Sequence, residues 1–227
     1  METLAIEITW ILTNIFILPP PTVNEILFVN RDFSQTSQVF NLLNVFLQSQ
    51  NLHLKVIALE AVANAVTNNL EVSRAFINEQ VLISTIYSLC GDEKLSKSVL
   101  LSFADILLNF AELKLISQID SGLHTAYAIG SLKKVIYCEK SYIEFKGLVT
   151  LARLFEDSSL NQTLLKTYAK EKIVDLACRQ LEQNLNEPLI HANMIQLLVH
   201  FSALEFEGDN QNLDQYLAKP EHLSLYL

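Results

Sequence analysis

Three stretches of this 227-residue chain resemble one another: residues 8–15 (ITWILTNI), 59–66 (LEAVANAV) and 104–111 (ADILLNFA). Each stretch is an apolar run interrupted by one asparagine, and alignment on that residue puts Asn14, Asn64 and Asn109 in register. A segment that is apolar on most of its sides is typical of a helix packed between neighbours. We therefore predict that the three stretches are equivalent helices of an internal repeat.

The same register extends further along the chain. It places Arg153 in residues 148–155 (LVTLARLF) and His200 in residues 195–202 (IQLLVHFS), so the successive intervals are 50, 45, 44 and 47 residues. A period in the mid-forties is that of armadillo and HEAT arrays. The sequence thus predicts an all-α, right-handed, armadillo/HEAT-like α-solenoid of about four to five repeats.

Apolar residues at helical spacing predict further helices between these stretches. We expect helices over residues 36–48, 52–67, 71–79, 81–90 (ended by Gly91), 92–113, 160–181 (with Ser158 or Ser159 as N-cap) and from Pro188 to 203. A short, a medium and a long helix per unit is the armadillo order. We expect an armadillo-like domain over residues 1–205, with its first repeat incomplete, and a polar C-terminal tail or cap over 206–227.

The composition excludes several other classes. Half of the chain is apolar, which is too much for a disordered protein. Only five glycines and five prolines occur, with no proline from residue 22 to 187, so the frequent turns of a β-sandwich are missing. The glycines are isolated, so there is no Rossmann or P-loop motif. The composition favours a soluble helical protein.

The net charge of −9 argues against nucleic acid as a partner, because phosphate backbones bind cationic surfaces. Arg31 is the only Lys or Arg in the first 54 residues. An acidic surface of this kind attracts basic peptides. The partner we expect is therefore a protein, either through an extended, basic segment or as neighbouring subunits of a complex.

The three cysteines, Cys90, Cys138 and Cys178, are far apart and odd in number, which favours buried thiols in a reducing compartment, cytoplasmic or nuclear. Residues 1–18 lack the basic start of a signal peptide and are too short for a membrane span. The five histidines form no H-E-x-x-H motif, and no cysteine pair has metal-ligand spacing. We expect no enzyme activity, no cofactor and no metal.

Residues 10–14 (WILTN) form a W-x-x-x-N motif, and the wider run 7–15 (EITWILTNI) resembles the third-helix sequence of importin alpha, the armadillo-repeat adaptor for nuclear localisation signals. The resemblance implies a role in protein transport and a concave groove that holds an extended peptide. In that family the asparagine amide grips the peptide backbone, and the tryptophan stacks on the stems of lysine or arginine. Asn14 and Trp10 match these two positions.

The chemistry of tryptophan and asparagine four residues apart is consistent with peptide binding. Residues four apart share one helix face, an amide offers both a donor and an acceptor, and an indole attracts a cation by about 0.5–2 kcal/mol. At the tryptophan position the later repeats carry Glu60, Asp105, Val149 and Gln196. We therefore predict a binding site made of Trp10, Asn14, Glu60, Asn64, Asp105 and Asn109, in which carboxylates replace the later aromatic rings.

Structural alternatives exist for each of these residues. The asparagines can satisfy the ends of neighbouring helices, Trp10 can belong to a core or an interface, and Glu60 and Asp105 can be solvated charges. If the groove is vestigial, the chain is instead an architectural subunit of a large multiprotein assembly, held by surfaces outside the groove.

Overall fold

The computed structural model describes residues 2–30, 32–78, 84–85, 89, 97–118, 122–184 and 186–203. These residues are mostly helical, as the sequence predicts for an all-α protein. They belong to two compact units, unit 1 (Met1–Val135) and unit 2 (Ile136–Leu227), each with its own buried side chains.

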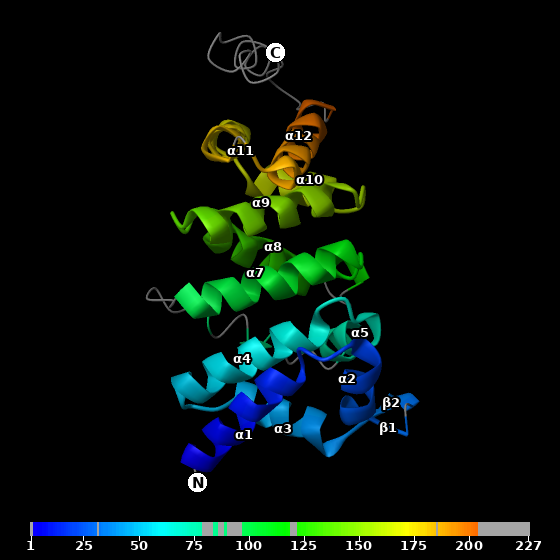
Figure 1. The fold of residues 1–227 in the computed structure, drawn as a ribbon. Helices are drawn as coiled ribbons and strands as arrows, with labels where there is room; N and C mark the ends of the chain where they lie inside the picture. Colours follow the sequence, from blue (N-terminus) through cyan, green and yellow to red (C-terminus); the bar gives the residue numbers. More distant parts are fainter. Residues whose placement is uncertain are drawn as a thin grey trace. The chain divides into compact units, whose positions relative to one another are not determined.

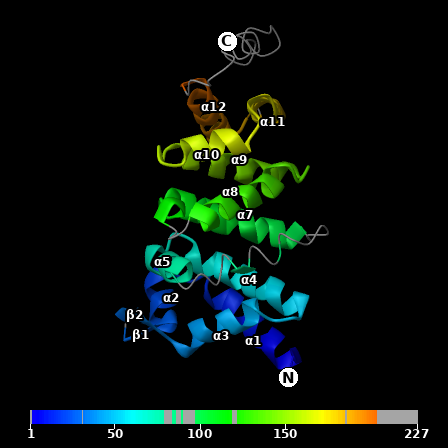
Figure 2. The same ribbon diagram turned by 180° about the vertical axis from the view of Figure 1, so that it is seen from behind.

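Three long helices of unit 1 carry the three similar stretches. They are α1 (Glu2–Ile15), α4 (Leu52–Val66) and α7 (Lys97–Glu112). Helix α4 contacts α1 on one side and α7 on the other, and the three helices run in the same direction (Figures 1 and 2). Four buried alanines of α4, at 58, 61, 63 and 65, allow these close neighbours because a methyl group takes little space. The nearly uniform apolar character of α4 is explained by this position.

Several short elements and one further long helix complete unit 1. They are α2 (Pro20–Leu27), β1 (Phe28–Val29), β2 (Asp32–Thr36), α3 (Gln38–Leu47), α5 (Leu70–Asn78), the 3-10 turn η1 (Ile116–Gln118) and the long helix α8 (Gly122–Ile136), which ends at the boundary of the unit. Strands β1 and β2 form an antiparallel hairpin with Phe28 opposite Thr36 and Val29 opposite Asp32.

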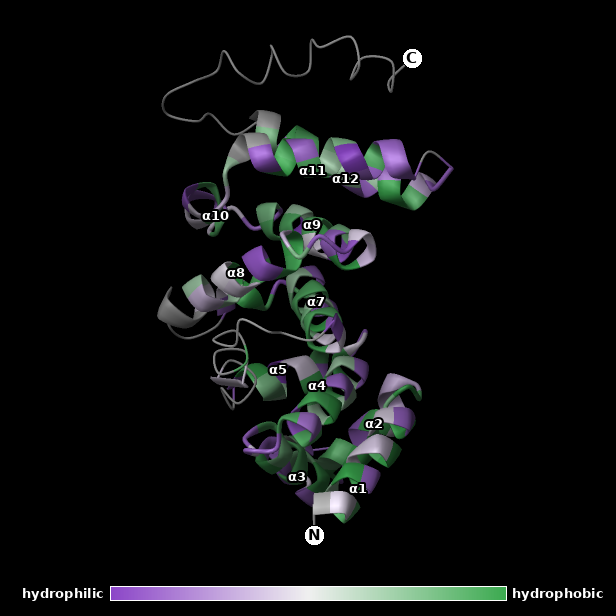
Figure 3. Cartoon of the chain, turned by 90° about the vertical axis from the view of Figure 1, so that its left-hand side faces the viewer, coloured by the Kyte–Doolittle hydropathy of each residue, from purple (hydrophilic) through white to green (hydrophobic). Residues whose placement is uncertain are grey.

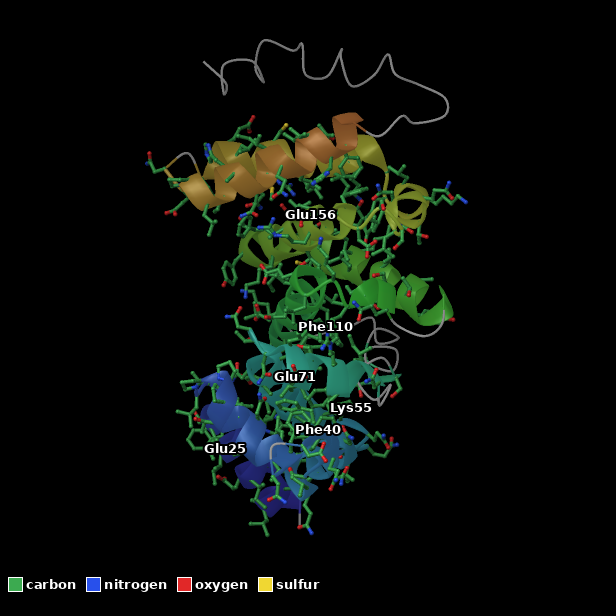
Figure 4. The ribbon with its side chains drawn as sticks, turned by 90° about the vertical axis from the view of Figure 1, so that its right-hand side faces the viewer. Glu25, Phe40, Lys55, Glu71, Phe110 and Glu156 are labelled. Atoms are coloured by element: carbon green, nitrogen blue, oxygen red, sulfur yellow. The ribbon has the colours of Figure 1, made fainter. Side chains whose placement is uncertain are left out.

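An aromatic cluster holds the short elements of unit 1 together. The Phe40 ring lies 4.6 Å from the Phe76 ring and 6.5 Å from the Phe28 ring, between ring centroids. All three side chains are buried, and Figure 4 shows Phe40 inside the unit. The cluster therefore joins the hairpin, α3 and α5 in one core.

Unit 2 contains α9 (Ser141–Phe155), α10 (Asn161–Thr167), α11 (Lys170–Gln183) and α12 (Pro188–Ala203). Helix α9 contacts the other three, and α11 also contacts α12. Helix α11 shows both hydrophilic and hydrophobic bands (Figure 3), since Ile173, Val174, Ala177 and Leu181 are buried while its charged residues Lys172, Asp175 and Arg179 are exposed. Its apolar side forms part of the unit's core.

Most of the predicted helices are present, with ends that differ by a few residues. Helices α3, α4, α5, α7 and α12 occupy the stretches predicted at 36–48, 52–67, 71–79, 92–113 and 188–203. The single helix predicted over residues 160–181 is wrong, because the chain is extended at Tyr168 and Ala169 between α10 and α11. Neither Ser158 nor Ser159 is the N-cap of α10, which begins after Leu160. The helix predicted at 81–90, its Gly91 end and the tail at 206–227 lie outside the described residues, apart from three positions of the former.

Candidate functional site

Asn64 and Asn109 each reach the end of the preceding long helix. The Asn64 side-chain amide donates a hydrogen bond of 2.9 Å to the Thr13 carbonyl near the end of α1. The Asn109 Oδ1 accepts one of 3.0 Å from the backbone N–H of Asn68, which follows the end of α4. Because the last carbonyls of a helix have no partner within it, the Asn64 bond satisfies a group that would otherwise need water. Both bonds tie one long helix to the next.

The backbone after α4 prepares this contact. Asn68 has a φ of 53°, in the left-handed region that asparagine tolerates better than most residues. Lys114, which follows α7, has a similar φ of 54°. A left-handed residue at this position is a common way to end a helix. At Asn68 it presents the N–H to which Asn109 binds.

The three asparagines differ in which side-chain amide groups remain free to bind a ligand. An amide has two N–H groups and an acceptor oxygen. Asn14 is exposed and donates to the Trp10 carbonyl at 2.7 Å, while the half-buried Asn64 uses one N–H on Thr13. Each therefore keeps its oxygen and one N–H. Asn109 is buried, accepts from Asn68 and donates to the Asp105 carbonyl at 2.8 Å, so its oxygen and one of its two N–H groups are used within the protein.

Trp10 is 59% exposed and is the single tryptophan of the chain. It lies one turn before Asn14 on α1, and the exposed Glu60 lies one turn before Asn64 on α4. Because α1 and α4 are side by side and Asn64 contacts Thr13, Glu60 lies at the level of the turn that holds Trp10. We call Trp10, Asn14, Glu60 and Asn64 the α1–α4 site.

Asp105 and Asn109, the pair predicted on α7, are more buried than the matching pairs on α1 and α4. Asp105 is half-buried, and its carbonyl accepts the hydrogen bond from Asn109. Of the six residues predicted from the sequence, four lie on the adjacent helices α1 and α4 and are exposed or half-buried, while Asn109 bonds to the backbone that follows α4.

The corresponding positions in unit 2 make contacts between helices. Arg153 on α9 donates to Asn193 Oδ1 at 3.2 Å and to Gln196 Oε1 at 3.0 Å, both on α12. Val149 is buried, and the His200 ring stacks on Phe155 with centroids 6.2 Å apart. These side chains join α9 to α12, as Asn64 joins α4 to α1.

Sequence patterns gave no sign of a second polar contact in unit 2. The buried Glu144 accepts hydrogen bonds from Arg179 at 2.7 Å and from Gln180 at 2.9 Å, which links α9 to α11. Glu144 is the only carboxylate of α9, and such a group requires partners when it is buried, but the sequence alone does not show that it is buried.

The cysteines are consistent with ordinary buried thiols. Cys178 is buried as predicted, Cys138 is half-buried, and Cys90 lies outside the described residues. Burial raises the pKa of the Cys178 thiol to about 11, and the carboxylates of Glu182 and Asp175 add to the effect. Burial also raises the pKa of Cys138. A raised pKa leaves little thiolate at neutral pH, so neither thiol is a strong nucleophile.

Among the described residues, no group of three His, Cys, Asp or Glu side chains is arranged to hold a metal ion. No described helix is both long and apolar enough to cross a membrane. No protein-family model, no curated protein sequence and no solved structure matches the chain.

Proposed function

We propose that this chain is a non-catalytic, armadillo-like protein-binding module, and that its α1–α4 site binds an extended basic segment of a partner protein. The observation that carries the proposal is the exposure of the Trp10 ring close to two asparagines that keep free amide groups. The resemblance of residues 7–15 to the importin alpha motif agrees with it. A role in protein transport, in the cytoplasm or nucleus, belongs to the same proposal.

The groups of the α1–α4 site suit a basic ligand in three ways. The indole face of Trp10 can hold a lysine or arginine side chain by a cation–π contact. The amides of Asn14 and Asn64 each retain a donor and an acceptor, which matches the N–H and C=O of an extended backbone. The Glu60 carboxylate supplies a negative charge next to them. An acidic or fully apolar segment would lack two of these three interactions.

The arrangement of unit 1 supports the armadillo-like part of the proposal. Helices α1, α4 and α7 are adjacent, run in the same direction and carry their asparagines at equivalent positions. The bonds from Asn64 and Asn109 connect each long helix to the one before it. Nearest-neighbour contacts of this kind are the main stabilising contacts of repeat arrays.

A second candidate function is that of an architectural subunit of a large assembly. The observation that favours it is that Asn109, Arg153 and Gln196, at positions of the predicted groove, are used for contacts between helices. A chain with this function would bind its partners through other surfaces, and the α1–α4 site would not bind a basic peptide.

The test is a titration of the whole chain with a fluorescently labelled, extended, lysine-rich peptide, using a glutamate-rich peptide as control. Binding is followed by peptide anisotropy and by the emission of Trp10, which reports on the site directly because the chain has no other tryptophan. The lysine-rich peptide should bind at low salt and should bind less as salt rises, since exposed charges are screened beyond about 8 Å at physiological ionic strength.

Variants locate the binding. Trp10→Ala, Asn14→Ala and Glu60→Gln should each weaken the binding of the lysine-rich peptide. Glu182→Gln removes the same charge from an exposed position on α11 and should have no effect. If the wild type does not bind at low salt, or if Glu60→Gln and Glu182→Gln behave alike, the peptide-binding function is wrong and the architectural one is favoured.

A further inference from the structure

The outer face of α1 is apolar although one side of the helix already packs into unit 1. Thr9, Leu12 and Thr13 are buried on the inner side. On the outer side Leu4 is 65% exposed and Ile11 is 50% exposed, and they lie two turns apart on the same face. Ile17 and Leu18, just beyond the helix end, are 71% and 47% exposed. We call Leu4, Ile11, Ile17 and Leu18 the outer face of α1.

These four aliphatic side chains stay exposed within unit 1. Contiguous exposed apolar side chains on a folded protein mark an interaction surface. We therefore treat the outer face of α1 as an interaction surface, and the charges near it indicate which kind of partner fits.

The charged residues of the N-terminal segment that carries this face are all acidic. Residues 2–30 contain Glu2, Glu7 and Glu25 and no Lys, Arg or His. Glu7 is exposed on α1 between Leu4 and Ile11, and Figure 4 shows Glu25 on α2 at the outer edge of unit 1. A partner that buries the aliphatic side chains brings its own flanking residues beside these carboxylates. Cationic flanks would be attracted and acidic ones repelled.

Such flanks are missing from a second copy of α1, from α12 and from segments 79–96 and 204–227, most of which lie outside the described residues. Residues 79–96 contain Glu79, Asp92 and Glu93 and a single cation, Lys94. A second copy of α1 would place the same glutamates opposite one another. Helix α12 also exposes aliphatic side chains, Leu189, Ile195 and Val199, but it contains no Lys or Arg. Residues 204–227 contain five acidic residues and one cation, Lys219. Charge complementarity therefore points to another protein.

We propose that the outer face of α1 docks an amphipathic helix of a partner protein, with aliphatic residues along one side and Lys or Arg along the edges of that side. Helix α1 is about 21 Å long at 1.5 Å per residue, which matches a partner helix of about four turns. This recognition mode, in which an amphipathic helix lies on an apolar surface, is common in proteins. The four residues of the outer face are not members of the α1–α4 site, although Ile11 adjoins Trp10, and the proposal does not depend on the proposed function.

The experiment uses the full chain and a designed Leu/Lys peptide as long as α1, with all leucines on one helical side. A peptide of identical composition but scrambled order, which has no apolar side, is the first control, and a Leu/Glu peptide of the same pattern is the second. Binding is measured by anisotropy of the labelled peptide and by Trp10 emission, because Trp10 adjoins Ile11. Only the patterned Leu/Lys peptide should bind appreciably.

Variants test the location. The double variant Leu4→Asp, Ile11→Asp should weaken binding roughly tenfold or more, since both removed side chains would be central to the contact. Because both are exposed, circular dichroism should remain that of the wild type. The matched control, Leu189→Asp with Val199→Asp, makes the same change on α12 and should leave the affinity unchanged. Glu7→Lys should also weaken binding, by removing the attraction for the cationic flanks.

Three results would overturn the proposal: equal binding of the scrambled peptide, equal loss in the α12 control, or a dimer in sedimentation that Leu4→Asp, Ile11→Asp dissolves. The last would make a second copy of this chain the occupant. Glu60→Gln separates this proposal from the proposed function. This variant should weaken the binding of the extended lysine-rich peptide and leave the binding of the patterned Leu/Lys helix unchanged. Either proposal can therefore fail without the other.

Discussion

At the scale of single residues, the three repeat asparagines have the same register and different uses. Asn14 is exposed, Asn64 shares its amide between α1 and the surface, and Asn109 is enclosed by Asn68 and Asp105. The difference arises from where the preceding helix ends. Asn68 turns its N–H toward Asn109, and within the described part of the chain no equivalent N–H bonds to Asn14 or to the oxygen of Asn64.

Replacing Asn109 should therefore affect stability rather than binding. Asn109→Ala removes the part-buried hydrogen bond to the Asn68 N–H, which costs roughly 0.5–1.5 kcal/mol of unfolding free energy. Urea unfolding followed by circular dichroism measures this as a lower midpoint. Asn14→Ala, at an exposed position, should stay within about 0.5 kcal/mol of wild type. Equal effects in the two variants would show that the bond from Asn68 contributes nothing.

Cys178 should resist alkylation in the folded protein. Burial raises the pKa of its thiol from the ordinary 9.0 to about 11, so thiolate forms only in strongly alkaline solution. Iodoacetamide at pH 8, followed by peptide mass spectrometry, should label Cys178 slowly in the native chain and rapidly in urea. Rapid native labelling at pH 8 would contradict the buried, protonated thiol.

The same shift has a consequence for stability, with a definite sign. The folded state holds the Cys178 proton to higher pH than the unfolded state does, so folding binds protons between pH 9 and 11. The contribution of the neutral thiol is fully present below pH 9 and is lost as the pH rises through 11. Stability should thus decline over this interval, and less steeply in Cys178→Ala.

The sequence predicted the site residues only in part, for a physical reason. The spacing of four between Trp10 and Asn14 follows from helix geometry alone, so their shared face could be inferred. The hydrogen bond that occupies the Asn109 oxygen depends on the left-handed backbone at Asn68, and no residue pattern in the sequence predicts that conformation. The Glu144–Arg179 contact was equally hidden, because its two residues are 35 positions apart.

At the scale of elements, helices with strong apolar spacing were predictable and breaks without glycine or proline were not. Helix α4 matches its predicted stretch because both faces are buried and Asn51 caps its start, accepting from the Leu54 N–H at 3.1 Å. The break between α10 and α11 falls at Tyr168, whose side chain is 2% exposed. Burial of that ring in unit 2 accompanies the extended backbone there, and local propensity gives no sign of it.

The hairpin was not predicted because its second strand, β2 (DFSQT), is mostly polar and lacks the alternating apolar pattern of a strand. It is held by Phe28, which is buried against Phe40 and lies 5.1 Å from Phe33 between ring centroids. Phe28→Ala should lower the unfolding free energy by about 3–5 kcal/mol, because it opens a cavity in the core. Phe33→Ala, at a position that is 46% exposed, should cost much less.

Thermal unfolding followed by circular dichroism distinguishes the two phenylalanines. The melting temperature should fall strongly for Phe28→Ala and slightly for Phe33→Ala. If both variants melt like the wild type, the hairpin is not part of the unit 1 core. If both fall equally, the exposed ring contributes as much as the buried one, and the contact between Phe28 and Phe33 is the main stabilising feature.

At the scale of the whole molecule, the chain forms two compact units with separate aromatic cores. Phe40 belongs to the core of unit 1, and Phe201, whose ring lies 4.8 Å from the Phe155 ring, belongs to that of unit 2. Local opening of a protein follows such cooperative groups rather than the chain as a whole. The two units should therefore respond separately to mild changes in their cores.

Two matched variants test this independence by hydrogen exchange with mass spectrometry. Phe40→Leu and Phe201→Leu both shorten a fully buried aromatic ring, a change that should reduce stability by roughly 1–3 kcal/mol without unfolding the chain. Phe40→Leu should speed amide exchange in α4 and leave α9 at the wild-type rate, while Phe201→Leu should do the reverse. Faster exchange in both helices with either variant would mean that the two units open together. In that case the chain would unfold as one cooperative body rather than as two.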